Sequence, residues 1–374
     1  MNDKEKCCAR RKTSIGGQAL MEGIMMRGPE KSAMAVRRAN GEIVFEESVN
    51  QKKKRPRICR WPVIRGVFGF IDSMVIGYKA LMRSAEIAIE DEMAAEEAKK
   101  AEQATEQAEN APVTEEAATV EQTPECDSKE EEKEKKSGFS KGAMTAIVVV
   151  ATVLGFALAI GLFVWLPSFL YNLIADFTPS DWKLGENRYL RSVFEGILKI
   201  VVLVLYMALV SLMKDIRRTF MYHGAEHKTI FCYEKGAALT VENVKKQSRF
   251  HPRCGTSFLI LMLLVSIVIG LFIPPTFEGI NPTLYTVIRA AIKLLLIPLT
   301  MGVGYEILKF AGKHENVVTR IISAPGMWLQ RITVKEPTDD MIECAIKAFI
   351  AVLPEEEKKA EMAAADPDAQ IVTE

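Results

Sequence analysis

The feature that most constrains the fold is a run of 24 residues, 143–166, without a charged side chain. About 20 predominantly apolar residues are enough for a helix to cross a membrane. Three more apolar segments follow, at roughly 193–213, 257–274 and 286–308. The second segment carries Glu195 and Lys199, and the fourth carries Arg289 and Lys293 near one end. We therefore expect a mainly α, polytopic membrane protein with about four spans.

The charges of the connecting segments predict the orientation. Nine Lys/Arg lie in 214–256, three lie in 167–192 and none lies in 275–285. Segments rich in Lys and Arg stay in the cytoplasm. Both termini and 214–256 are therefore expected there. Residues 1–42 have no apolar stretch typical of a cleavable signal.

Composition shifts divide the chain into five predicted regions. Residues 1–60 are expected to form a cytoplasmic N-terminal segment with a β-hairpin, and 61–85 an interfacial or re-entrant helix. An acidic disordered linker is expected at 86–141. A four-span membrane domain with a cytoplasmic His-rich arm at 214–256 is expected at 142–312, and a cytoplasmic C-terminal region with amphipathic helices at 313–374.

Local patterns support this division. Asn40-Gly41 between alternating runs predicts the hairpin, and the glycine-rich stretch 15–29 is typical of a tight loop or irregular strand. Charges at Arg65, Asp72 and Lys79 form one stripe of a helix at 62–83, which could lie on the membrane, re-enter it or belong to a small soluble domain.

The net charge is zero, but 86–141 holds 18 Asp/Glu against 7 Lys/Arg. This linker could be helical to about 109, and 110–141 is too polar to offset the entropy of ordering. The positive excess elsewhere lies mostly beside the apolar segments and suits an anionic lipid surface. Nucleic acid is not an expected partner, and the seven cysteines form no C-x-x-C pair and are expected as free thiols.

The sequence His223-Gly224-Ala225-Glu226-His227 is the most informative motif for chemistry. Residues i and i+4 share one face of a helix. The H-x-x-E-H spacing therefore offers two imidazoles to one metal ion with a carboxylate beside them, the order found in inverzincins. Chance matches to so short a motif are frequent.

The segments around this motif have their own signals. The helix of the second span is expected to continue through Lys214 to Tyr233 and to stop at Gly236, with Thr240 capping a helix at 241–249. The bend 251–255 would return His251 and Cys254 to the membrane surface near His223 and His227. A turn followed by a short amphipathic piece is expected at 325–330, an amphipathic helix at 338–353 and a loose tail from 354.

Zinc suits imidazole and thiolate ligands, and three protein ligands plus water are typical of a catalytic site. His223, His227, His251 and Cys254 are the predicted ligands, and Glu226 is the predicted general base toward the activated water. Glu22 and Glu306 are further candidates. Alternatively, the histidines contact lipid phosphates or neighbouring helices.

Four other residues have plainer interpretations. Arg27 and Arg253 suit headgroup phosphates, because a guanidinium binds phosphate as a fork. Trp328 is typical of an interfacial anchor, and Cys232 is expected to be a buried thiol.

Several long stretches resemble one bacterial family: 15–29, 222–229, 247–258 and 325–331. They are similar to the YqhQ-like multi-pass membrane proteins, a domain of unknown function often labelled as a predicted metal-dependent enzyme. The resemblance covers nearly the whole chain except 86–141, and it implies a location in the bacterial plasma membrane.

Three functional hypotheses remain at this point. The first is a metal-dependent hydrolase acting on a membrane protein, a membrane-proximal peptide or a lipid-linked substrate. The second is a non-enzymatic scaffold or assembly factor with a structural metal. A transporter ranks last, because the spans show no internal repeat and few paired polar groups.

Overall fold

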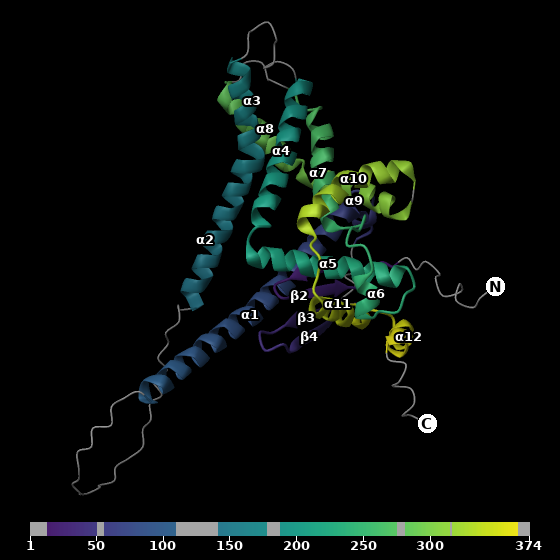
Figure 1. The fold of residues 1–374 in the computed structure, drawn as a ribbon. Helices are drawn as coiled ribbons and strands as arrows, with labels where there is room; N and C mark the ends of the chain where they lie inside the picture. Colours follow the sequence, from purple (N-terminus) through teal and green to yellow (C-terminus); the bar gives the residue numbers. More distant parts are fainter. Residues whose placement is uncertain are drawn as a thin grey trace, which may run out of the picture.

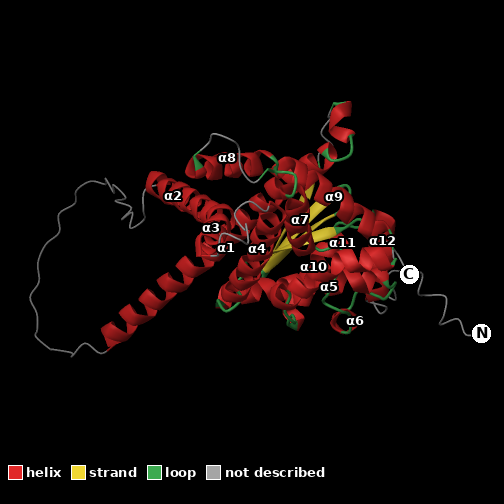
Figure 2. Ribbon diagram, turned by 90° about the horizontal axis from the view of Figure 1, so that it is seen from above, coloured by secondary structure: helices red, strands yellow, loops and turns green. Residues whose placement is uncertain are grey.

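The computed structural model describes residues 13–50, 56–109, 141–177, 188–274, 281–314 and 316–365. The described chain is mainly helical, with one small antiparallel sheet near its N-terminus (Figures 1 and 2). A group of apolar helices stands on one side of this sheet, and the sheet lies among α1, α5 and α11.

The sheet is a meander whose strands pair in chain order: β1 Gly16–Leu20, β2 Gly23–Arg27, β3 Lys31–Arg37 and β4 Ile43–Val49. The β3–β4 hairpin confirms the predicted one, and Gly41 has a φ of +89° that its turn requires. The glycine-rich stretch forms the β1–β2 hairpin, an outcome more regular than the predicted loop or irregular strand.

Both faces of the sheet are covered, so its central strands are apolar on both sides. On one face Met25 and Met34 pack with Ile76 and Ile87 of α1. On the other face Ile24, Met26, Ala33 and Ala35 pack with α5 and α11. This alternation follows from the period of two in a strand. The sheet therefore holds α5, which carries the H-x-x-E-H motif, at a defined position.

Helix α1, Ile64–Glu109, follows a short 3-10 turn, η2 Arg57–Arg60. It continues through the Ala/Glu-rich stretch 86–109, so the predicted boundary at 86 falls inside a helix. Residues 110–140 lie outside the described residues. Arg65 at the start of α1 forms a fork with Glu306, and several apolar side chains of α1 are exposed: Ile71, Met74, Val75 and Tyr78.

Two continuous helical stretches are long and apolar enough to cross a membrane. The first combines α2 Lys141–Ile160, a π-turn η3 Gly161–Trp165 and α3 Leu166–Phe177; the second is α4 Arg188–Val210. A third is possible if α8 Pro282–Leu295 and α9 Ile297–Lys313, bent by 43°, count as one span. Helix α7, Gly255–Gly270, is apolar but has only 16 residues.

The arm after α4 differs from the predicted continuous helix. The α4 helix ends at Val210, Met213 is extended, and α5 Lys214–Glu234 begins in a new direction (Figure 1). The break lets α5 pack on the sheet instead of extending along the α4 axis. Gly236 has a φ of +68° after α5, as expected of a helix stop, and Thr240 caps α6 Val241–Lys245, which is shorter than predicted.

The C-terminal region is more helical than predicted. Helix α10, Val317–Thr333, includes Pro325, where a turn was expected. An Asn316–Thr319 capping box starts this helix, and at Gly326 its backbone packs against Ser257 of α7. Helix α11, Asp339–Ala351, confirms the predicted amphipathic helix. Helix α12, Glu355–Ala365, replaces the start of the predicted loose tail, whose last residues lie outside the described part.

Gly224 is needed where the chain after α10 crosses α5. The Lys335 N–H donates to the Phe220 carbonyl at 2.9 Å. An added Cβ at Gly224 would lie 2.0 Å from the Lys335 carbonyl oxygen. The glycine costs helix propensity, yet it permits this approach.

We predict that Gly224→Ala lowers the free energy of unfolding by about 1–3 kcal/mol, because backbone atoms must move apart. Thermal unfolding of the detergent-purified protein measures the change. The matched control is Gly155→Ala in α2, where a Cβ meets nothing within 4 Å. Equal melting temperatures for both variants would contradict the proposed close approach.

Candidate metal centre

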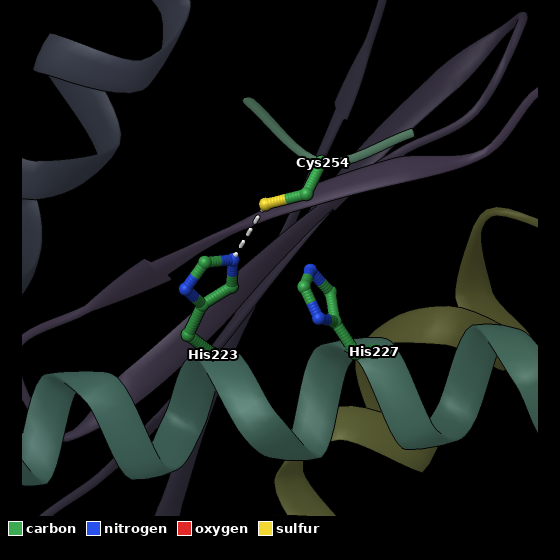
Figure 3. Close-up of side chains that lie close together, drawn as sticks. All are labelled: His223, His227 and Cys254. Atoms are coloured by element: carbon green, nitrogen blue, oxygen red, sulfur yellow. Dashed lines mark hydrogen bonds between the residues drawn. The ribbon is translucent and has the colours of Figure 1, made fainter. Parts of the chain in front are cut away.

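His223, His227 and Cys254 form a compact group of metal-ligating side chains (Figure 3). The two histidines lie one turn apart on α5, and Cys254 is the N-cap of α7. One ligand atom from each residue lies within 4.8 Å of the other two. The His223 Nε2 and Cys254 Sγ atoms are 3.2 Å apart. The group therefore links the N-terminal end of α7, an apolar helix, to α5, which packs on the sheet.

Both imidazoles are oriented by main-chain carbonyls. His223 Nδ1 lies 3.1 Å from the Thr333 oxygen, and His227 Nδ1 lies 2.6 Å from the Arg249 oxygen. A carbonyl only accepts, so each Nδ1 carries the proton and each Nε2 keeps its lone pair. Metal-bound histidines are held in this way, because the outer hydrogen bond sets tautomer and ring angle.

Burial and charge favour neutral imidazole at His227. Its side chain is buried, and burial together with neighbouring His223 lowers its pKa. A neutral imidazole is the form that binds metal. His223 is half-buried, so the group is reached from the His223 side.

Glu226 lies beside the group and faces β1. Its carboxylate accepts a hydrogen bond from the Gly17 N–H at 3.0 Å. Burial raises the pKa of this carboxyl, while His223 and the Gly17 hydrogen bond lower it by less. A Cβ at Gly17 would lie 2.8 Å from the Glu226 carboxyl carbon. Gly17 of the glycine-rich stretch therefore packs against Glu226 of the H-x-x-E-H motif, a placement that the sequence left open.

His251 is near the group but does not belong to it. Its Nδ1 accepts from the Arg253 N–H at 3.3 Å, and its Nε2 lies 3.6 Å from Glu234. Its ring packs on Phe231 with centroids 4.6 Å apart. The structure thus brings three of the four predicted ligands together and turns the fourth toward a carboxylate.

The other sequence candidates lie in ion pairs or on the surface. Glu22 forms a fork with Arg218, and Glu306 forms one with Arg65. Arg253 contacts Glu234 and the Thr13 carbonyl.

Three further residues from the sequence analysis have simple surroundings. Arg27 donates to Ser73. Trp328 is 66% exposed. Cys232 is buried as predicted, and burial raises its pKa to about 11.

The group lies on the wall of a cavity of about 1000 Å³. Residues 13–19, which include the start of the glycine-rich stretch, form one side, and the N-terminal end of α7 with the C-terminal half of α9 forms another. Glu226 and the three candidate ligands line it together with the apolar side chains of Leu259, Tyr305 and Leu308. A molecule larger than water can therefore reach the candidate metal ligands and the carboxylate.

Gln330 of α10 is a supporting residue that the sequence analysis did not single out. It is fully buried, and it accepts from the His251 N–H at 2.9 Å and donates to the His251 carbonyl at 2.7 Å. This pair of bonds holds the bend that positions Cys254. Its place within the stretch 325–331 was visible in the sequence, but its partner was not.

We predict that Gln330→Ala destabilises the protein by about 1–3 kcal/mol, since it leaves buried main-chain groups of His251 unpaired. Chemical denaturation followed by circular dichroism measures this loss. Trp328→Ala on the same helix removes an exposed side chain and serves as the control. A Gln330 variant as stable as the control would show that the bend is held by other contacts.

Comparison with known proteins identifies the chain's relatives. A family model described as "Protein of unknown function (DUF1385)" matches residues 61–355. The "Uncharacterized protein YqhQ" of Bacillus subtilis (strain 168) is 31% identical over 342 residues, covering 91% of this chain and 92% of the relative. No solved structure matches the chain. The matched regions include α5, the bend before α7 and α10, so the chain belongs to the DUF1385 family of proteins of unknown function.

Proposed function

We propose that this protein is a metal-dependent membrane enzyme, a hydrolase whose metal is held by His223, His227 and Cys254 at the cytoplasmic surface. The observation that carries the proposal is the convergence of these ligand atoms within 4.8 Å on the wall of a cavity that Glu226 also lines. The two imidazoles come from α5 and the thiol comes from the start of α7, so one bound ion would connect the two helices.

The donor set favours zinc. Two imidazoles and one thiolate are ligands that zinc accepts at about 2.0–2.3 Å. The Nδ1 hydrogen bonds of both histidines leave their Nε2 lone pairs free, and these Nε2 atoms would hold the ion. Zinc bound there would supply Lewis-acid chemistry and lower the pKa of a water molecule.

Three protein ligands leave a coordination position for substrate or water, whereas structural zinc sites are closed by four. The adjoining cavity favours the open type. Glu226, fixed by the Gly17 N–H, is the proposed proton acceptor. A lipid-linked or membrane-proximal peptide substrate fits the position of the cavity, which lies beside the N-terminal end of α7 and the C-terminal half of α9.

The membrane part of the proposal has four spans with both termini in the cytoplasm. The α2–α3 stretch and α4 are the first two, α7 with the residues to 274 is the third, and the bent α8–α9 pair is the fourth. Exposed apolar side chains along the first two support contact with lipid: Val153, Leu154, Phe156, Leu158, Leu205 and Leu209. The nine cationic residues of 214–256 support the orientation.

We predict that the purified protein binds about one zinc ion per chain and that a His223→Ala/His227→Ala double variant binds none, because the remaining thiolate is a single ligand. Elemental analysis of the detergent-purified protein measures this ratio. Arg83→Gln, an exposed substitution on α1, is the control. A metal-free wild type after zinc loading would contradict both the enzyme and the structural-metal hypothesis.

We predict that Glu226→Gln keeps its zinc but loses at least about a hundredfold in hydrolysis, because an amide accepts the Gly17 bond yet takes no proton. Turnover of p-nitrophenyl acetate and bis(p-nitrophenyl) phosphate by the zinc-loaded protein is the assay. Equal hydrolysis by this variant and the wild type would favour the alternative of a scaffold or assembly factor with a structural metal.

A further inference from the structure

A second group of charged residues lies at the end of the helical bundle far from the sheet, where α3, α4 and α8 meet (Figure 1). Its centre is Glu195 of α4, which is 2% exposed. Arg191 donates to Glu195 through Nε at 3.1 Å, Arg289 lies 3.4 Å from it, and Lys293 also donates to it. We call these four residues the Glu195 cluster.

The Glu195 cluster carries unbalanced charge. Its three cationic side chains all contact the same carboxylate. Lys199, one turn further along α4, interacts electrostatically with Glu195 and Arg289 and adds positive charge. Among the described residues, no ion pair other than that with Glu195 is found for Arg191, Arg289 or Lys293. One carboxylate cannot neutralise this set.

Two hydrogen-bond donors of the cluster lack acceptors, although Arg289 also donates to the Tyr285 hydroxyl at 3.4 Å and to Ser192 Oγ at 3.5 Å. Within the described part of the chain, Arg191 Nη2 and Arg289 Nε are buried and have no partner. Arg191 stacks near the rings of Tyr171 and Tyr285, which give its cation aromatic contact at 5.4 and 5.8 Å. Buried donors without acceptors are costly, and ionisable groups inside a membrane bundle commonly mark a binding site.

We propose that the Glu195 cluster binds an oxyanion of the phosphate class, either a lipid headgroup phosphate or a free phosphate ion. A tetrahedral oxyanion offers several acceptor oxygens to guanidinium forks and lysines. The anion approaches past Lys293, the most exposed cation of the cluster, at 16%. This site is separate from the metal centre, which lies at the opposite end of the bundle.

A purely structural ion-pair network predicts different behaviour. In such a network Glu195 is the partner on which all three cations depend, so its removal weakens the protein, and the wild type binds no anion. In an anion site Glu195 competes with the ligand for the same cations. Removing its charge then strengthens anion binding.

The experiment uses the full-length protein and two probes. Titration calorimetry in detergent measures the binding of inorganic phosphate. Native mass spectrometry after reconstitution in nanodiscs of equal phosphatidylglycerol and phosphatidylcholine measures retained anionic lipid. The variants are Arg289→Gln, Arg289→Lys and Glu195→Gln, and the control is Arg83→Gln, whose exposed side chain pairs with Glu46 at 2.8 Å. Melting temperatures identify any variant that fails to fold.

We expect Arg289→Gln to weaken binding at least about tenfold, Arg289→Lys to restore part of it, and Glu195→Gln to strengthen it about tenfold. Phosphate binding without lipid retention assigns a free anion, and the reverse assigns a headgroup. The proposal is wrong if wild type binds neither probe, or if a folded Glu195→Gln variant binds no more tightly than wild type. Should Arg289→Gln fail to fold, the Glu195 result alone decides.

Discussion

The packing of α5 between the sheet and the chain after α10 is the constraint on which the rest of the structure depends. One side of α5 packs on apolar side chains of β2, β3 and α11. Across Gly224, the Lys335 carbonyl approaches so closely that a methyl group has no room. A helix held on two sides cannot rotate about its axis. His223 and His227 are therefore directed toward the N-terminal end of α7, where Cys254 lies.

Burial of these polar side chains requires partners, and the surrounding segments supply them. The carbonyls of Thr333 and Arg249 accept hydrogen bonds from the two imidazoles, and the Gly17 N–H donates one to Glu226. The Gln330 amide pairs with the main-chain N–H and carbonyl of His251 in the bend. These partners come from β1, from the segment after α6 and from α10, so the centre forms only when β1, α5, α7 and α10 assemble. This dependence explains why four separated stretches of the sequence converge on one place.

The sequence-based predictions succeeded where one local signal decides the outcome. Asn40-Gly41 predicted a hairpin because few sequences can make that turn, and the apolar runs predicted helices because their length and composition leave little choice. They failed where packing overrides local preference. Pro325 lies inside α10 although proline usually ends a helix, and α5 breaks from α4 because its apolar face packs on the sheet.

By itself the sequence determined which residue types could bind a metal and that His223 and His227 share one face, because i,i+4 spacing is a property of every helix. Only the tertiary structure decided which residue joins these two histidines. His251 and Cys254 are three residues apart in a bend, where no period relates side-chain directions, and contacts with Glu234 and Gln330 turn His251 away while the α7 N-cap turns Cys254 inward. Long-range contacts of this kind depend on the assembled fold, so local spacing cannot encode them.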